Sequence, residues 1–183
     1  MEEVFRKYSG DVHNGTDKGT THSYLAAYEE VFSPRRADKI RLFEIGVYTG
    51  ASLLAWADYF THAETEIIGV DINPYLVRFP LTNPKVKTHV CNATVPADLA
   101  KIEGTFDFVI DDGSHELAHQ MTSFYLLKER VNPGGAYIIE DIQSMDDVDM
   151  LTKFVEMAGY KAKLYDTRAV KGRYDDLMLV ITK

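Results

Sequence analysis

Two pairs of adjacent carboxylates are the side chains of this sequence best suited to chemistry. Asp111 and Asp112 end one short apolar run, and Glu140 and Asp141 end another. If the two runs are neighbouring parallel strands, all four carboxylates lie at one edge of the sheet, where their repulsion favours a bound cation. Oxygen donors without a thiolate suit Mg²⁺ before Ca²⁺ or Mn²⁺. The alternative is that these carboxylates cap the following helices and stay solvated.

One histidine lies close to the first acidic pair. His115 follows Asp112 by three residues, next to the start of an expected helix, for which Ser114 is the expected cap. A helix amino terminus and a nearby cation both disfavour imidazolium, so a neutral His115 could accept a proton. We therefore predict His115 as a general base. Comparable acidic surroundings are not expected for the other five histidines, which are His13, His22, His62, His89 and His119.

A glycine-bearing turn separates an earlier apolar run from the helix that follows it. Gly46 allows a close approach to the backbone and Gly50 allows close helix packing, but Tyr48 departs from the dinucleotide fingerprint GxGxxG. Asp71 ends the next apolar run, where a carboxylate can accept hydrogen bonds from ribose hydroxyls. With Glu44, these residues favour a nucleoside site without a pyrophosphate. The alternative is that Glu44 and Asp71 only cap neighbouring helices.

The elements that must position these residues follow from the hydrophobic pattern. Short apolar runs alternate with segments of helical period, which predicts an α/β fold with a doubly wound seven-stranded sheet and helices on both faces. The polar connection 166–176 has no helical period, so the last two strands are expected to pair as an antiparallel hairpin. The predicted strands are 40–45, 66–71, 86–90, 106–111, 136–140, 161–165 and 177–181. The predicted helices are 21–32, 51–60, 97–102, 117–130, which the Asn-Pro-Gly-Gly sequence at 132–135 should end, and 148–158.

Composition limits the class of protein. A length of 183 residues fits one domain, 1–183, in which residues 1–38 precede the sheet as a lid or cap segment. The net charge of −8 opposes nucleic-acid binding. The single cysteine, Cys91, allows neither an internal disulfide nor a cysteine zinc site. Without a signal or membrane-spanning run, we expect no membrane partner and a cytoplasmic location.

Two further groups of side chains are expected to have structural and not functional roles. Tyr24, Tyr28 and Phe32 have helical spacing, which favours a packing face over an aromatic lid. Arg168, Lys171 and Arg173 lie in the connection between the last two strands, where a solvated loop is expected.

The motifs together resemble those of class I S-adenosylmethionine-dependent methyltransferases. More narrowly, the sequence is similar to the metal-dependent sugar O-methyltransferases of the macrocin and mycinamicin type, from antibiotic biosynthesis. The resemblance covers nearly the whole chain. Its motifs are Glu44-x-Gly46 with Gly50, Asp71, Asp-Asp-Gly-Ser-His at 111–115, Ile-Glu-Asp at 139–141, and upstream Thr16-Asp17-Lys18 followed by His22, Tyr24 and Tyr28.

This resemblance implies a set of site residues. It places the metal ligands at Asp112, Glu140 and Asp141 and the general base at His115. The strand pattern alone leaves open whether Asp111 or Asp112 is a ligand, because consecutive side chains of a strand point to opposite faces. The predicted contacts to S-adenosylmethionine are Glu44, Gly46, Gly50, Ser52, Asp71, Asn92, Ala93 and Asp111.

The implied activity is transfer of the sulfonium methyl group of S-adenosyl-L-methionine to a hydroxyl of a sugar or glycosylated small molecule, with Mg²⁺ or Mn²⁺. Coordination lowers the pKa of the hydroxyl, and His115 removes its proton. Three alternatives are a catechol-type O-methyltransferase, a non-catalytic module that binds S-adenosylmethionine, and a nicotinamide oxidoreductase. The partner is a small molecule, and the sequence leaves a homo-oligomer open.

Overall fold

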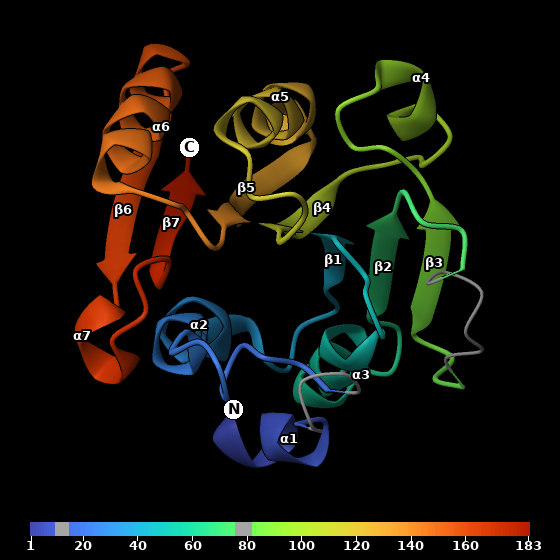
Figure 1. The fold of residues 1–183 in the computed structure, drawn as a ribbon. Helices are drawn as coiled ribbons and strands as arrows, with labels where there is room; N and C mark the ends of the chain where they lie inside the picture. The colour runs from blue at the N-terminus through green and yellow to red at the C-terminus, as the bar shows by residue number, and fades with distance from the viewer. Residues whose placement is uncertain (10–14, 76–81) are drawn as a thin grey trace.

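The structure is a computed structural model that describes residues 1–9, 15–75 and 82–183; His13 lies outside the described residues. These residues form a seven-stranded sheet in the order β3-β2-β1-β4-β5-β7-β6. Strands β1 to β5 run parallel, and β7 is antiparallel to both β5 and β6, which confirms the predicted fold class (Figure 1). The strands are β1 (Arg41–Ile45), β2 (Glu66–Asp71), β3 (Val86–Val90), β4 (Phe106–Asp111), β5 (Val131–Ile139), β6 (Lys161–Asp166) and β7 (Leu177–Thr182).

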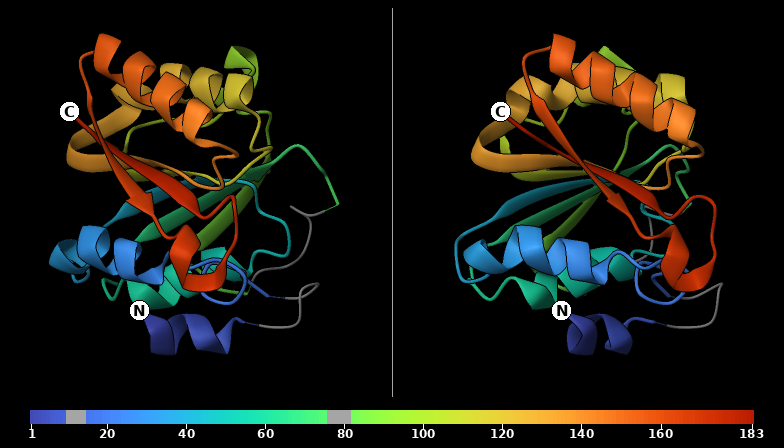
Figure 2. Two further views of the ribbon diagram at one scale, coloured as in Figure 1. Left: turned by 60° about the vertical axis from the view of Figure 1, so that its left-hand side comes forward. Right: turned by 90° about the vertical axis from the view of Figure 1, so that its left-hand side faces the viewer.

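Helices cover both faces of the sheet. Figure 2 shows α4, α5 and α6 on one face and α2 and α3 on the other, with α1 packed outside α3. The α-helices are α1 (Glu2–Lys7), α2 (Leu25–Phe32), α3 (Ala51–Tyr59), α4 (Pro96–Leu99), α5 (Leu117–Leu127), α6 (Met145–Met157) and α7 (Arg168–Lys171), and the 3₁₀ helices are η1 (Ser33–Arg35) and η2 (Lys128–Arg130). No helix among the described residues is long and apolar enough to span a membrane.

Two apolar cores hold the central strands in place. Alternate side chains of β4 point to opposite faces, so Val109 packs on the side of α5 while Phe108 and Ile110 pack on the side of α2 and α3. Trp56 of α3 is fully buried, and its ring centroid lies 4.8 Å from that of Tyr28. Tyr24, Tyr28 and Phe32 are all buried, which confirms their predicted packing face.

The start of β5 differs from the prediction. Residues 132–135 do not end a helix; helix α5 ends at Leu127, η2 follows, and the Asn-Pro-Gly-Gly sequence lies within β5. Gly135 explains the difference, because a Cβ atom there would lie 2.1 Å from the carbonyl oxygen of Asp107. Only glycine lets the two backbones approach this closely, and the register between β4 and β5 shifts at the same place.

Three helix boundaries and one cap also differ. Helix α4 ends at Leu99 and not at residue 102. Residues 21–24 are not helical, and α2 begins at Leu25, because the backbone NH groups of His22 and Tyr24 bond to the carbonyls of Asp17 and Lys18 in turns. Helix α6 begins at Met145, where Ser144 accepts a hydrogen bond from the NH of Asp147. The N-cap of α5 is Glu116 and not Ser114.

The connection between β6 and β7 was also predicted incorrectly in two respects. It contains a short helix, α7, which ends at Gly172 with φ +75°. Lys171 is exposed, but it belongs to this helix and its Nζ atom donates to the carbonyl oxygens of Gly19, Thr20 and His22 at 2.6–2.9 Å. This connection, the hairpin loop (residues 167–176), therefore contacts an amino-terminal strap (residues 15–24).

Candidate active site

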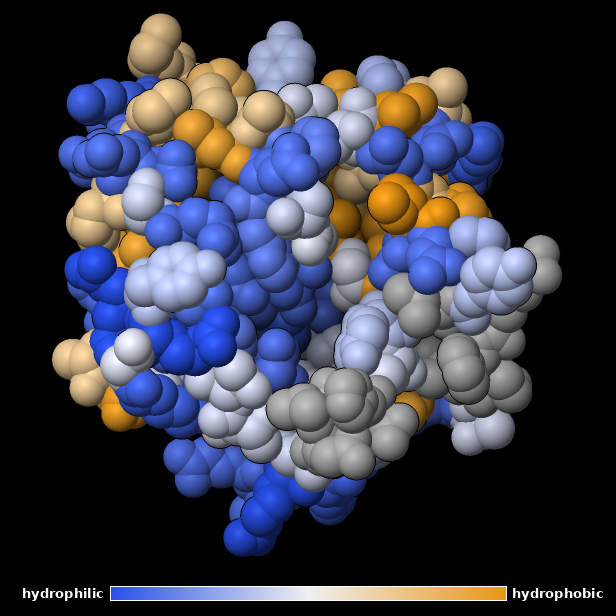
Figure 3. Space-filling view, viewed as in Figure 1, coloured by the Kyte–Doolittle hydropathy of each residue, from blue (hydrophilic) through white to orange (hydrophobic). Residues whose placement is uncertain are grey.

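The carboxyl ends of β1, β2, β4 and β5 border a cavity of about 840 Å³, which the strap partly covers. Hydrophilic side chains gather around a central hollow in the face that Figure 3 shows. Among the predicted site residues, the cavity is lined by Gly46, Ser52, Asp71, Asp112, His115 and Asp141. Residues distant in the sequence therefore meet where ligands bind in open parallel sheets.

The glycine turn places the ends of β1 and β4 in direct contact. Gly46 has φ +93°, and a Cβ atom there would lie 2.0 Å from the carbonyl oxygen of Asp112. The NH of Asp112 bonds to the carbonyl of Ile45 at 3.0 Å. Asp71 closes the turn from β2, since its Oδ2 atom accepts a hydrogen bond from the NH of Val47 at 3.0 Å. Gly46 is thus required both for its own backbone conformation and for the position of Asp112.

We expect Gly46→Ala to weaken S-adenosylhomocysteine binding by more than about tenfold, because strain of about 1–3 kcal/mol at a positive φ and a backbone clash both displace the turn. Isothermal titration calorimetry measures this affinity. Gly134→Ala is the matched control, since Gly134 also has a positive φ, but a Cβ atom there would meet nothing within 4 Å among the described residues. Equal affinities of the two variants would contradict the role of Gly46.

The other predicted cofactor residues divide into two groups. Asn92, Ala93 and Asp111 line a second cavity of about 310 Å³, to which Gly46 and Asp71 also contribute. Glu44 lines neither of these cavities; it is fully buried, and its two oxygens accept hydrogen bonds from Ser52 and Trp56, both at 2.7 Å. Gly50, with φ +78°, is the N-cap of α3. Glu44 and Gly50 therefore support the glycine turn through helix α3 and do not line either cavity.

A buried lysine lies among the carboxylates. The Nζ atom of Lys18 lies 2.6 Å from Asp112 Oδ2, 2.6 Å from Glu140 Oε2 and 3.7 Å from Glu44 Oε1. The hydroxyl of Tyr28 donates to Glu140 Oε1, so both oxygens of Glu140 have partners. Burial lowers the pKa of Lys18, but the charges of the three carboxylates outweigh burial and hold it well above its usual range. Lys18 therefore remains a cation.

The charge of Lys18 does not balance the site. In addition to the three carboxylates around Lys18, the site contains Asp141, which is 5% exposed. Burial, followed by the charge of Asp112, raises the pKa of Asp141 to about 6. Ligand atoms of Asp112, His115 and Asp141 lie within 4.8 Å of one another. Glu140, the third predicted metal ligand, is not in this group, because Lys18 and Tyr28 occupy its two oxygens. The carboxylates of Asp112 and Asp141 and the excess of negative charge fit a hard divalent cation.

His115 faces two carboxylates across this group. Its Nε2 atom lies 3.3 Å from Asp112 Oδ1 and 3.7 Å from Asp141 Oδ2. Burial lowers the pKa of His115, but the hydrogen bond to Asp112 and the charge of Asp141 outweigh it and raise the pKa. The neutral imidazole that we predict therefore requires a cation that offsets these carboxylates. His115 and Asp141 have φ values of +59° and +53°, a strained conformation of the kind found at functional sites.

Sequence reasoning missed several contributors. His22 was expected to lack acidic surroundings, and this is wrong: its Nδ1 atom lies 2.7 Å from Asp176 Oδ1 and 3.2 Å from Asp141 Oδ1. Tyr24 donates a hydrogen bond to Asp141 Oδ1 at 2.7 Å. Lys18, His22 and Tyr24 belong to the upstream motif, which could have indicated them, whereas nothing in the local pattern around Asp176 does so.

The model of a methyltransferase-domain family matches residues 43–142, more than half of the chain. This chain belongs to that methyltransferase family. It is 41% identical over 143 residues to 8-demethyl-8-alpha-L-rhamnosyl tetracenomycin-C 2'-O-methyltransferase of Streptomyces olivaceus, covering 73% of this chain and 36% of the relative. It is 34% identical to demethylmacrocin O-methyltransferase of Streptomyces fradiae, with 68% and 33% covered.

A solved structure agrees with these relatives. MycE methyltransferase from the mycinamycin biosynthetic pathway, in complex with Mg, SAH and mycinamycin VI, superposes with a TM-score of 0.62 at 31% identity. The match covers 76% of this chain and 36% of MycE. These matches confirm the resemblance to the macrocin- and mycinamicin-type enzymes. The chain spans about a third of the length of these relatives.

Proposed function

We propose that this chain transfers a methyl group from S-adenosyl-L-methionine to a hydroxyl group of a sugar or glycosylated small molecule. The observation that carries the proposal is the convergence of Asp112, His115 and Asp141 beside the cavity that the Gly46 turn and Asp71 border. The relatives, which are named as O-methyltransferases, one of them of a rhamnosyl compound, support the same activity.

The two cavities suggest how the cofactor binds. We assign the ribose hydroxyls to Asp71, which is the carboxylate shared by both cavities. The smaller cavity, lined by Asn92, Ala93 and Asp111, suits the adenine base, and Ser52 and the Gly46 turn suit the methionine portion. Because the main cavity extends from Asp71 to Asp141, the sulfonium group and the acceptor can share it.

We assign the divalent cation, Mg²⁺ or Mn²⁺, to Asp112, Glu140 and Asp141. When bound, it supplies Lewis acidity that lowers the pKa of a nearby hydroxyl. Asp112 Oδ1 and Asp141 Oδ2 are the carboxylate oxygens that face His115, while Lys18 and Tyr28 fix the orientation of Glu140. We assign the acceptor proton to Nε2 of His115, since this ring nitrogen faces the carboxylates that would hold the cation, whose charge would offset theirs.

Residues 1–38 are proposed to cap the cavity. The strap contributes Gly15, Thr16, Asp17, Thr20 and Thr21 to the cavity lining, which supports this role. Their hydroxyl groups and the carboxylate of Asp17 are suited to hydrogen bonds with a polyhydroxylated acceptor.

Removal of divalent cations tests the proposed function. We expect dialysis against EDTA to lower methyl transfer to a glycoside acceptor by about 100-fold or more, because Lewis-acid assistance amounts to several kcal/mol. Added Mg²⁺ or Mn²⁺ should restore the rate. Circular dichroism of the dialysed chain is the control for folding. Unchanged turnover of the folded chain in chelator would contradict the metal assignment, and a parallel screen of catechols would detect the catechol-type alternative.

A further inference from the structure

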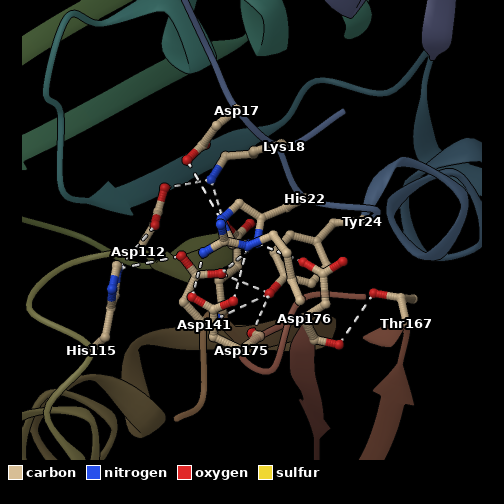
Figure 4. A network of polar contacts seen from close by, with 12 residues as sticks. Asp17, Lys18, His22, Tyr24, Asp112, His115, Asp141, Thr167, Asp175 and Asp176 are labelled. Carbon is tan, nitrogen blue, oxygen red and sulfur yellow. Dashed lines mark hydrogen bonds and ion pairs between the residues drawn. The ribbon is translucent and has the colours of Figure 1, made fainter. Parts of the chain in front are cut away.

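His22 connects two carboxylates that lie at the same edge of the sheet, since β5 and β7 are neighbouring antiparallel strands. In Figure 4 its ring lies beside Asp141, which follows β5, and Asp176, which precedes β7. The Nδ1 atom is 2.7 Å from Asp176 Oδ1 and 3.2 Å from Asp141 Oδ1. His22 is 4% exposed and Asp176 is fully buried. The imidazole also stacks on Tyr24, with 5.2 Å between the ring centroids.

These contacts decide which nitrogen carries hydrogen. A lone pair on Nδ1 would face two carboxylate oxygens and repel both, whereas an N–H at the same position can donate to them. We therefore assign the Nδ1–H form to His22. Within the described part of the chain, Asp176 Oδ2 has no hydrogen-bond partner. The carboxylate of Asp176 is therefore held through Oδ1, which contacts His22.

The consequence for Asp141 is that its two oxygens have different surroundings. Oδ1 accepts a hydrogen bond from the hydroxyl of Tyr24 at 2.7 Å and faces the Nδ1 atom of His22. Oδ2 points toward His115, 3.7 Å away, on the side of the main cavity. A carboxylate with one oxygen occupied in this way presents the other oxygen to a ligand.

We propose that His22, oriented by Asp176, is a positioning residue that fixes Asp141 so that its Oδ2 atom faces the divalent cation. This inference rests on the proposed function, because it concerns the same cation. Hydrogen-bond partners of metal-binding carboxylates generally change metal affinity by about 10- to 100-fold when they are removed. The hairpin loop completes the arrangement, since it supplies Asp176 and, through Lys171, contacts the carbonyl of His22.

Mn²⁺ binding to the full chain, measured by electron paramagnetic resonance, tests this role. We expect His22→Ala and Asp176→Asn to weaken Mn²⁺ binding by about 10- to 100-fold, with S-adenosylhomocysteine affinity in the absence of metal unchanged. His22→Asn should recover most of the affinity, because the asparagine amide nitrogen can donate from the position of Nδ1. Asp166→Asn is the matched control, since Asp166 adjoins the hairpin loop but pairs with the exposed Arg168.

Each outcome has a defined meaning. A proton observed on Nδ1 of His22 by nitrogen-15 NMR, together with the expected affinities, supports the proposal. Folded His22→Ala and Asp176→Asn variants that both bind Mn²⁺ within about threefold of the wild type overturn it, and Asp176→Asn alone decides if His22→Ala does not fold. A second Mn²⁺ that is lost in Asp176→Asn also overturns it, because His22 would then be a ligand. If the wild type binds no Mn²⁺, the metal assignment itself fails.

Discussion

Replacing His115 by alanine is expected to lower kcat by about 100- to 10,000-fold, the range over which general acid–base catalysis contributes. The Nε2 atom of His115 is the ring nitrogen beside Asp112 and Asp141, and its removal leaves no imidazole at that position. S-Adenosylmethionine affinity should change little, because we assign the cofactor to the Gly46 turn and Asp71. Steady-state kinetics at saturating cofactor, with calorimetry of cofactor binding, separate the two effects.

His89→Ala is the matched control for this experiment. His89 is exposed on the edge strand β3 and is not among the residues that line either cavity. We expect its variant to retain wild-type turnover. An unchanged kcat in His115→Ala would remove His115 as the base, whereas equal losses of kcat and cofactor affinity would indicate a collapsed site.

Replacing Lys18 by methionine is expected to lower the free energy of unfolding by about 3–5 kcal/mol. This range applies when one partner of a buried ion pair is removed and the other charge stays buried. Methionine approximates the length of the lysine stem but leaves Asp112 and Glu140 without their shared ammonium. Urea denaturation monitored by fluorescence of the buried Trp56 measures the loss.

Lys163→Met is the matched control for this second experiment. Lys163 pairs with Glu30 at 2.6 Å, but both side chains are more than half exposed. Exposed pairs contribute little to stability, so this variant should be nearly as stable as the wild type. Similar losses in the two variants would mean that burial of Lys18 does not set its contribution.

The sequence was sufficient where local pattern determines structure. Apolar runs predicted six of the seven strands to within one residue, and strand ends located the acidic pairs, because parallel strands place their carboxyl ends at one edge. The start of β5 escaped prediction. Its Asn-Pro-Gly-Gly sequence has the local signature of a turn, but Gly135 instead allows close contact with Asp107 on the neighbouring strand.

The candidate site was only partly predictable, because some of its contacts join residues that are far apart in the sequence. Asp71, Asp112, His115 and Asp141 end strands or follow them, so their approach follows from the fold. The partners that orient the carboxylates do not: Lys18 is 94 residues from Asp112 and 122 from Glu140. No periodicity relates residues so far apart, and only the packed structure brings them together.

The contact between the strap and the hairpin loop also affects the order in which the protein matures. His22 and Asp176 are 154 residues apart, so a ribosome has made nearly all of the sheet before it adds the residue that orients His22. Strands β1 to β4 can pair during synthesis, since domains fold as the chain emerges. A nascent or truncated chain without the hairpin loop lacks both Lys171 and Asp176. Synthesis of the hairpin loop is therefore a condition for a finished site, and unfinished polypeptides are expected to hold divalent cations less tightly.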